Sequence, residues 1–198
     1  MTAKSEYKLG LTGARSGRRR ISNIKTVLQR VGEVNDYLEI GVCEGWSAKW
    51  WLDNSLRSDT SRYVGIDAWV DWPKQELSGG EVYRSARDRL KPYGSKVELI
   101  TGWSMNELVK MSPKSFDVIY IDGNHDLLPV MIDSVLSWRL LRVGGVLLWD
   151  DYGQRARGKQ PKNAVQGFLR GIKGRYELLF ENWQMAVVKT KHATEDWG

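Results

Sequence analysis

Short apolar segments of strand length alternate with longer segments of helical spacing along most of this chain. Such alternation is typical of βαβ units, which favour a mostly parallel sheet with helices on both faces. The expected strands cover 37–40, 62–66, 97–100, 116–121, 146–149, 176–180 and 184–189. The expected helices cover 21–31, 47–56, 82–90, 129–141 and 163–172, and the first twenty residues have an irregular pattern. Because open parallel sheets bind ligands at the carboxyl ends of their strands, functional residues should follow the strands.

A length of 198 residues fits one domain with a substantial core. We expect a basic N-terminal segment and helix over 1–34, a main domain over 35–190 and a tail over 191–198. No apolar stretch approaches the ~20 residues that a membrane span needs, and none follows the basic N-terminus as in a secretory signal. The only cysteine, Cys43, cannot form a disulfide within the chain, which suits a reducing compartment. The sequence therefore predicts a cytoplasmic protein with no membrane partner.

The first motif, EIGVCEG at 39–45, follows the first expected strand and precedes a helix. Gly41 and Gly45 let the backbone turn sharply and approach a ligand closely, and the helix N-terminus attracts negative charge. The spacing differs from the G-x-G-x-x-G of dinucleotide sites. Glu39 can attract an ammonium group on a ligand. A turn glycine beside a surface glutamate would give the same pattern.

Acidic and aromatic residues follow the second and third expected strands. Asp67 lies 22 residues after Gly45, near the ~20-residue spacing at which such folds place an acid on a ribose. Trp103 and Ser104 stand where a base would lie, so the indole can pack on a ring and the hydroxyl can bond its edge. The alternatives are a turn or helix cap for Asp67 and a core position for Trp103.

Three more acids follow the fourth and fifth expected strands: Asp122, Asp150 and Asp151. If those strands are neighbours, the carboxylates come together and repel one another unless a cation neutralises them. Oxygen ligands suit Mg²⁺ or another hard divalent cation. Asp150 and Asp151 acting as caps or pairing with arginines is the alternative. His125 suits proton transfer near neutral pH, although a structural contact is an equal alternative.

These motifs, taken in order, resemble class I S-adenosylmethionine-dependent methyltransferases, and in particular methyltransferase family 24. The matching segments are LEIG at 38–41, GID at 65–67, IDGNH at 121–125, LLRVGG at 140–145 and DDY at 150–152. The resemblance implies a Rossmann-like, seven-stranded, mostly parallel sheet whose last strand is antiparallel. It makes 35–190 a methyltransferase domain.

The resemblance also implies roles for individual residues. S-adenosylmethionine would be bound by Glu39, Gly41, Gly45 and Asp67. Trp103 and Ser104, from their position after the third expected strand, and Asp122 complete the predicted cofactor site. Related catechol-type and sugar O-methyltransferases hold a metal with acids that match Asp122, Asp150 and Asp151. Their base is a lysine or an aspartate, whereas this chain has Asn124 and His125 at the corresponding positions. His125 is therefore the candidate base, beside Asp122.

The net charge of +6 is unevenly distributed. Residues 1–32 and 153–175 each carry +7, so the rest of the chain carries −8. Basic residues in these segments, Arg18, Arg19, Arg20, Arg155, Arg157, Lys159 and Lys162, could steer an anionic small-molecule acceptor to the site. The function favoured is metal-assisted O-methylation of such an acceptor, for example a sugar. A nucleic-acid-binding or nucleic-acid-modifying protein and a nicotinamide-dependent oxidoreductase are the alternatives.

Overall fold

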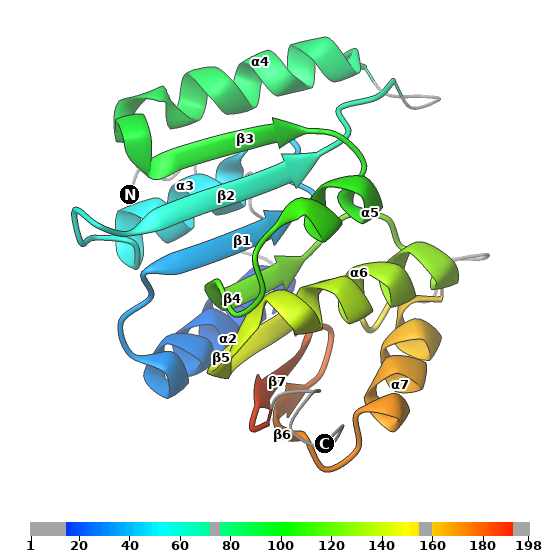
Figure 1. Ribbon diagram of the computed structural model, residues 1–198. Coiled ribbons are helices and arrows are strands. Elements are labelled where there is room, and N and C mark those ends of the chain that lie inside the picture. Colours follow the sequence, from blue (N-terminus) through cyan, green and yellow to red (C-terminus); the bar gives the residue numbers. More distant parts are fainter. Residues whose placement is uncertain (1–14, 72–75, 155–159, 192–198) are drawn as a thin grey trace.

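The computed structural model describes residues 15–71, 76–154 and 160–191, which form one seven-stranded sheet (Figure 1). Its strand order is β3-β2-β1-β4-β5-β7-β6. The strands are β1 (Asp36–Ile40), β2 (Arg62–Asp67), β3 (Val97–Thr101), β4 (Phe116–Ile121), β5 (Leu141–Trp149), β6 (Tyr176–Glu181) and β7 (Met185–Lys189). Neighbouring strands are parallel from β3 through β5, and β7 runs antiparallel to both β5 and β6. The expected α/β fold with an antiparallel last strand is confirmed.

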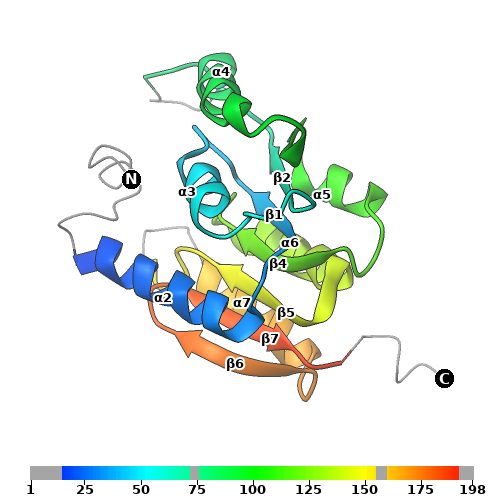
Figure 2. The same ribbon diagram turned by 90° about the vertical axis from the view of Figure 1, so that its left-hand side faces the viewer.

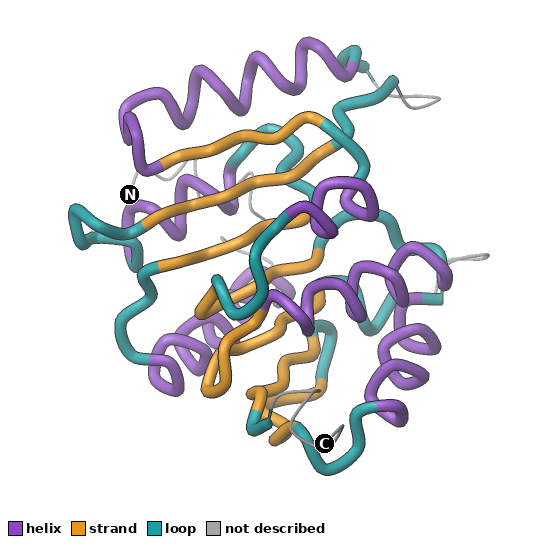
Figure 3. The backbone as a smooth tube through the Cα atoms, in the orientation of Figure 1, coloured by secondary structure: helices purple, strands orange, loops and turns teal. Residues whose placement is uncertain are grey.

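Helices cover both faces of the sheet (Figures 2 and 3). They are α2 (Arg15–Val31), α3 (Trp46–Asn54), α4 (Gly79–Leu90), α5 (Ser104–Glu107), α6 (Leu127–Leu140) and α7 (Pro161–Gly171), with the 3₁₀ turns η1 (Lys91–Lys96) and η2 (Leu108–Lys110). Side chains alternate across β1, so Leu38 packs with α6 and α7 while Tyr37 packs with α2 and α3. Trp51 and Trp149 are almost fully buried, one in each layer. Part of the tryptophan content therefore forms the core.

Several element boundaries differ from those expected. The helix α2 begins at Arg15, so residues 15–20 are helical and not irregular as expected. The apolar pattern marks only the part of the helix whose side chains pack on the core, including Ile24, Val27 and Leu28. The arginines before it are good helix formers. The strand β5 begins at Leu141, five residues earlier than expected. Its pairing with β4 shifts register between Leu141 and Val146, and Gly144 has φ 84° in this irregular part. The short elements α5, η1 and η2 were not expected, since one turn carries no periodic signal.

Candidate active site

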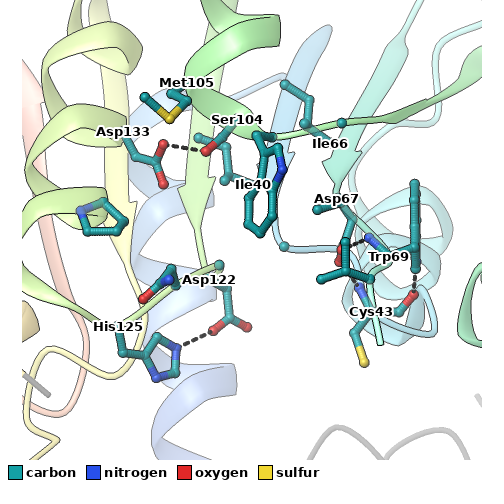
Figure 4. A pocket seen from close by; sticks show the side chains of 18 of the residues that line it. Ile40, Cys43, Ile66, Asp67, Trp69, Ser104, Met105, Asp122, His125 and Asp133 are labelled. Atoms are coloured by element: carbon teal, nitrogen blue, oxygen red, sulfur yellow. Dashed lines mark hydrogen bonds and ion pairs between the residues drawn. The ribbon is translucent and has the colours of Figure 1, made fainter. Parts of the chain in front are cut away.

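A cavity of about 620 Å³ opens at the carboxyl ends of β1, β2 and β4 (Figure 4). The central strand β1 lies between β2 and β4. Strands β2 and β3 follow on one side of β1 and strands β4 and β5 on the other, so the strand order reverses at β1. Ligands of open α/β sheets bind at such a point. The sequence-derived candidates that line this cavity are Gly41, Asp67, Trp103, Ser104, Asp122 and His125.

The loop after β1 approaches the end of β4 so closely that position 41 has no room for a side chain. Gly41 has φ 90°, and a Cβ built on it would lie 2.2 Å from the carbonyl oxygen of Asp122. Its N–H donates to the carbonyl of Ile66 at 2.9 Å. Gly45 has φ 76° and immediately precedes α3. Both glycines therefore have a conformational reason to be glycine.

Glu39 lies behind the cavity and not in its lining. Its side chain is fully buried and accepts hydrogen bonds from the hydroxyls of Ser47 and Tyr63. Burial raises the pKa of the Glu39 carboxyl to about 7, and the two hydrogen bonds oppose that rise. In this position the carboxylate links the first turn of α3 to β2. The expected contact with a ligand ammonium would require the side chain to turn.

Asp67 at the end of β2 joins two loops at the cavity wall. One carboxylate oxygen accepts the N–H of Cys43 and the other accepts the N–H of Trp69, both at 2.8 Å. The Trp69 indole donates in turn to the carbonyl of Cys43 at 3.0 Å. Cys43 and Trp69 both have positive φ, of 50° and 41°, an unfavourable conformation that such bonds maintain. Each carboxylate oxygen has a further lone pair that can accept a ligand hydroxyl.

The next wall of the cavity contains Trp103, Ser104 and a residue that the sequence analysis missed, Asp133. Trp103 is half exposed at the rim and is not a core residue. The Ser104 hydroxyl donates to Asp133 Oδ1 at 2.6 Å, and Asp133 on α6 is only 2% exposed. Burial raises the pKa of Asp133 to about 6, against the effect of the Ser104 bond. The sequence did contain a signal for Asp133, because it is the only acid in an otherwise mostly apolar helix.

Asp122, His125 and Asp151 lie together at the ends of β4 and β5. They offer potential ligand atoms within 4.8 Å of one another. His125 Nε2 is 3.4 Å from an Asp151 oxygen and 4.0 Å from an Asp122 oxygen. Asp151 has φ 48°, and its other oxygen accepts the indole N–H of Trp183 at 2.9 Å. The expected meeting of Asp122 with Asp151 therefore occurs, with His125 beside them.

The side chain of Asp150 does not belong to this group. It is 4% exposed, and its two oxygens accept the hydroxyl of Tyr120 at 2.5 Å and the N–H of Asp151 at 2.8 Å. The same Tyr120 hydroxyl lies 3.4 Å from an oxygen of Asp122. Asp150 is thus linked to Asp122 through Tyr120 and is outside the group of three potential ligands found among the described residues.

A smaller cavity, of about 250 Å³, shares Gly41, Cys43 and Asp122 with the larger one. It lies between α2, α3 and the sheet, and the first turn of α3 lines it through Trp46 and Ser47. Its other polar wall is Gln184, 1% exposed, whose Oε1 accepts from Asn23 on α2 at 2.9 Å. The Nε2 group of Gln184 has no acceptor among the residues that the structure describes. This wall was not anticipated, because Gln184 and Asn23 are 161 positions apart.

Most of the expected basic surface lies outside the described residues. Arg155, Arg157 and Lys159 fall in the gap at 155–159, and the side chains of Arg18, Arg19 and Arg20 are likewise not described. Lys162 is described, and it forms an exposed ion pair with Glu181 at 3.5 Å. No helix in the described ranges combines the length and apolar character needed to cross a membrane.

Comparison with known proteins adds to this geometry. Residues 38–152 match the model of a family described as a methyltransferase domain. An uncharacterised protein of Acanthamoeba polyphaga mimivirus is 28% identical over 145 residues, which are 71% of this chain. The chain spans 62% of the length of that curated relative.

Among solved structures, an SAH-bound methyltransferase from Podospora anserina has a TM-score of 0.64 at 20% identity. That alignment covers 96% of this chain and 89% of the other. An O-methyltransferase from Bacillus cereus in complex with SAH has a TM-score of 0.63 at 19% identity, covering 94% and 88%. These similarities establish the fold, and neither the family match nor the loop spacing favours the nicotinamide or nucleic-acid alternatives.

Proposed function

Because the chain belongs to this family of class I methyltransferase domains, we propose that it transfers the methyl group of S-adenosylmethionine to an oxygen of a small molecule. One observation carries the proposal. The cavity brings together a glycine loop, a strand-end carboxylate, Asp122 and His125, and Asp151 lies next to His125. All of these residues are within the segment that matches the family.

The proposed cofactor position follows from the polar groups along the cavity. Asp67 accepts the ribose hydroxyls, Gly41 lets the loop backbone pass close to the ligand, and Trp103 and Ser104 contact the base. The amino-acid end enters the smaller cavity, where Asp122 attracts the ammonium group. The carboxylate lies at the first turn of α3, whose N-terminus has no side-chain cap, and Gln184 Nε2 is a further donor there.

The proposed acceptor position is beside Asp122, His125 and Asp151. Two carboxylates and an imidazole fit a divalent cation that accepts both oxygen and nitrogen ligands, such as Mn²⁺, and they also fit Mg²⁺ through the carboxylates. When bound, such a cation lowers the pKa of a coordinated hydroxyl group. Asp122 and Asp151 would hold it, while Asp150 orients Tyr120 behind them in place of the ligand role expected from the sequence.

His125 has two mutually exclusive roles at this position. As a general base it takes the proton of the acceptor hydroxyl at Nε2, and the resulting imidazolium N–H is stabilised by the Asp151 carboxylate beside it. As a ligand it would use the same nitrogen. We propose the base role, which requires His125→Ala to retain metal affinity, measured by calorimetry with Mn²⁺, while methyl transfer falls about 10²–10⁴-fold. Loss of Mn²⁺ binding in this variant would instead assign His125 to the metal, and activity that survives complete chelation would remove the metal from the mechanism.

The decisive test of the cofactor assignment is calorimetric binding of SAH, the demethylated product. Asp67→Ala should weaken SAH by about tenfold or more, because hydrogen bonds to a charged acceptor are lost. Glu33→Ala, which changes an exposed acid outside the cavity, serves as the control. Equal affinity in wild type and Asp67→Ala would contradict the assignment.

An anionic acceptor remains part of the proposal, based on the charge distribution. Arg155→Ala with Arg157→Ala should lower kcat/KM for a negatively charged acceptor, and added salt should reduce the difference. Rates that respond neither to the substitutions nor to salt would favour an uncharged acceptor. The proposal of methyl transfer would not be affected.

A further inference from the structure

Asp133 is a buried acid that the proposed chemistry does not use. It is 2% exposed, yet it lines the large cavity. Ser104 donates to its Oδ1, and among the described residues no donor reaches its Oδ2. Because Asp133 lines the cavity wall (Figure 4), its Oδ2 can accept a hydrogen bond from a ligand in the cavity. This arrangement favours a ligand that supplies an N–H or O–H group.

The position of Asp133 indicates which part of a ligand supplies that donor. Asp67 ends β2, and Ser104 begins the helix that follows the neighbouring β3. In Figure 4 the Asp133–Ser104 pair lies across the cavity from Asp67 and Cys43, and apart from Asp122 and His125. A base attached to a ribose at Asp67 therefore extends toward Asp133, away from the reacting centre.

We infer that Asp133, oriented by Ser104, accepts a hydrogen bond from the 6-amino group of the cofactor's adenine and makes the site selective for 6-amino purines. This inference rests on the proposed function and adds a specificity residue to it. An adenine amino group can only donate at this position, and an ionised carboxylate can only accept. A purine with hydrogen at position 6 leaves Oδ2 unpaired, and a 6-oxo purine opposes it with a second acceptor.

The experiment compares calorimetric affinities for SAH, its analogue with hydrogen at position 6 and its 6-oxo analogue. Wild type should bind the 6-hydrogen analogue about tenfold to a hundredfold more weakly than SAH, since the lost bond involves a charged group. Asp133→Asn can keep the Ser104 bond through its carbonyl and present an N–H₂ group to the base. The preference for SAH should then disappear, and the 6-oxo analogue should gain affinity.

The ratio of affinities within one variant is the deciding quantity, because general loosening of the cavity affects all three ligands alike. Ser137→Ala is the matched control. It changes a buried residue one turn along α6 that does not line the cavity, and it should leave the ratio at its wild-type value. Ser104→Ala should reduce the ratio without reversing it.

Two results would overturn the inference, and only one of them would also contradict the proposed function. If wild type binds SAH but Asp133→Asn has the wild-type ratio of affinities, Asp133 does not accept a hydrogen bond from the base. The proposed function would then stand. If wild type binds none of the three ligands, the cofactor assignment and this inference both fail.

Discussion

Two of the buried carboxylates at the site, those of Glu39 and Asp133, differ in what surrounds them. Both have a raised pKa because burial disfavours their charge. Glu39 accepts from Ser47 and Tyr63, one donor on each oxygen. Asp133 accepts from Ser104 on one oxygen only, at the wall of the cavity. The comparison suggests that a carboxylate with both oxygens paired supports the backbone, whereas a half-paired one is suited to a ligand.

The largest expected effect concerns Glu39. Glu39→Ala should lower the free energy of unfolding by about 2–4 kcal/mol relative to Glu39→Gln, because it leaves two hydroxyl groups without an acceptor. Urea denaturation of both variants measures the difference. If the two variants are equally stable, the hydrogen bonds of Glu39 do not support the fold. Glu39 and Asp133 would then not differ in the way proposed here.

The pH dependence of stability should separate the two acids. A raised pKa in the folded state means that the stability is complete below the unfolded pKa and is lost as the pH rises through the folded value. For Glu39 that loss runs from about pH 4.5 to about pH 7 and amounts to roughly 3 kcal/mol. Glu39→Gln should flatten this part of the profile. A wild-type stability that does not fall between pH 5 and pH 7.5 would contradict the expected titration.

Removing the charge of Asp133 should stabilise the free protein and weaken cofactor binding at the same time. Its loss of stability runs from about pH 4 to about pH 6, so Asp133→Asn at pH 8 should gain about 2 kcal/mol. Thermal unfolding with and without SAH checks both effects. A variant that loses stability without ligand would indicate that Asp133 is structural, like Glu39.

The smallest effect is expected for Ser104→Ala. The hydroxyl lowers the pKa of Asp133, so its removal should raise that pKa further and change stability by only ~1 kcal/mol. Carbon-detected NMR titration of the Asp133 carboxyl measures the shift. A pKa that falls in this variant would mean that Ser104 does not donate to Asp133 in solution.

The sequence was sufficient to predict the fold and the edge of the sheet where the site lies. Each strand has a strong apolar pattern, and Gly41, Asp67 and Asp122 follow strands directly, so their common location depends only on the topology. The positions of whole strands are more predictable than the directions of side chains. Nothing in the DDY segment distinguishes the buried Asp150 from Asp151, which turns toward His125 through a positive φ.

Residues that reach the site from distant elements could not be predicted in the same way. Asp133 projects from the middle of α6, and Gln184 lies between β6 and β7, away from any strand end that carries a motif. Their roles depend on contacts with Ser104 and Asn23 across long separations in sequence. Local periodicity contains no information about such pairs.

The insertion of β7 between β5 and β6 has a consequence for the order in which the site is completed during synthesis. The segments that contain Gly41, Asp67, Ser104 and Asp133 leave the ribosome well before residues 182–184. Only then can Asn182 and Gln184 bond to Asn23 and fasten α2 beside the smaller cavity. A nascent chain that has reached α7 therefore has the lining residues of the larger cavity but lacks Gln184 in the wall of the smaller one. Cofactor capture should begin only when the closing hairpin has docked, a late step that pairs the latest and earliest described elements.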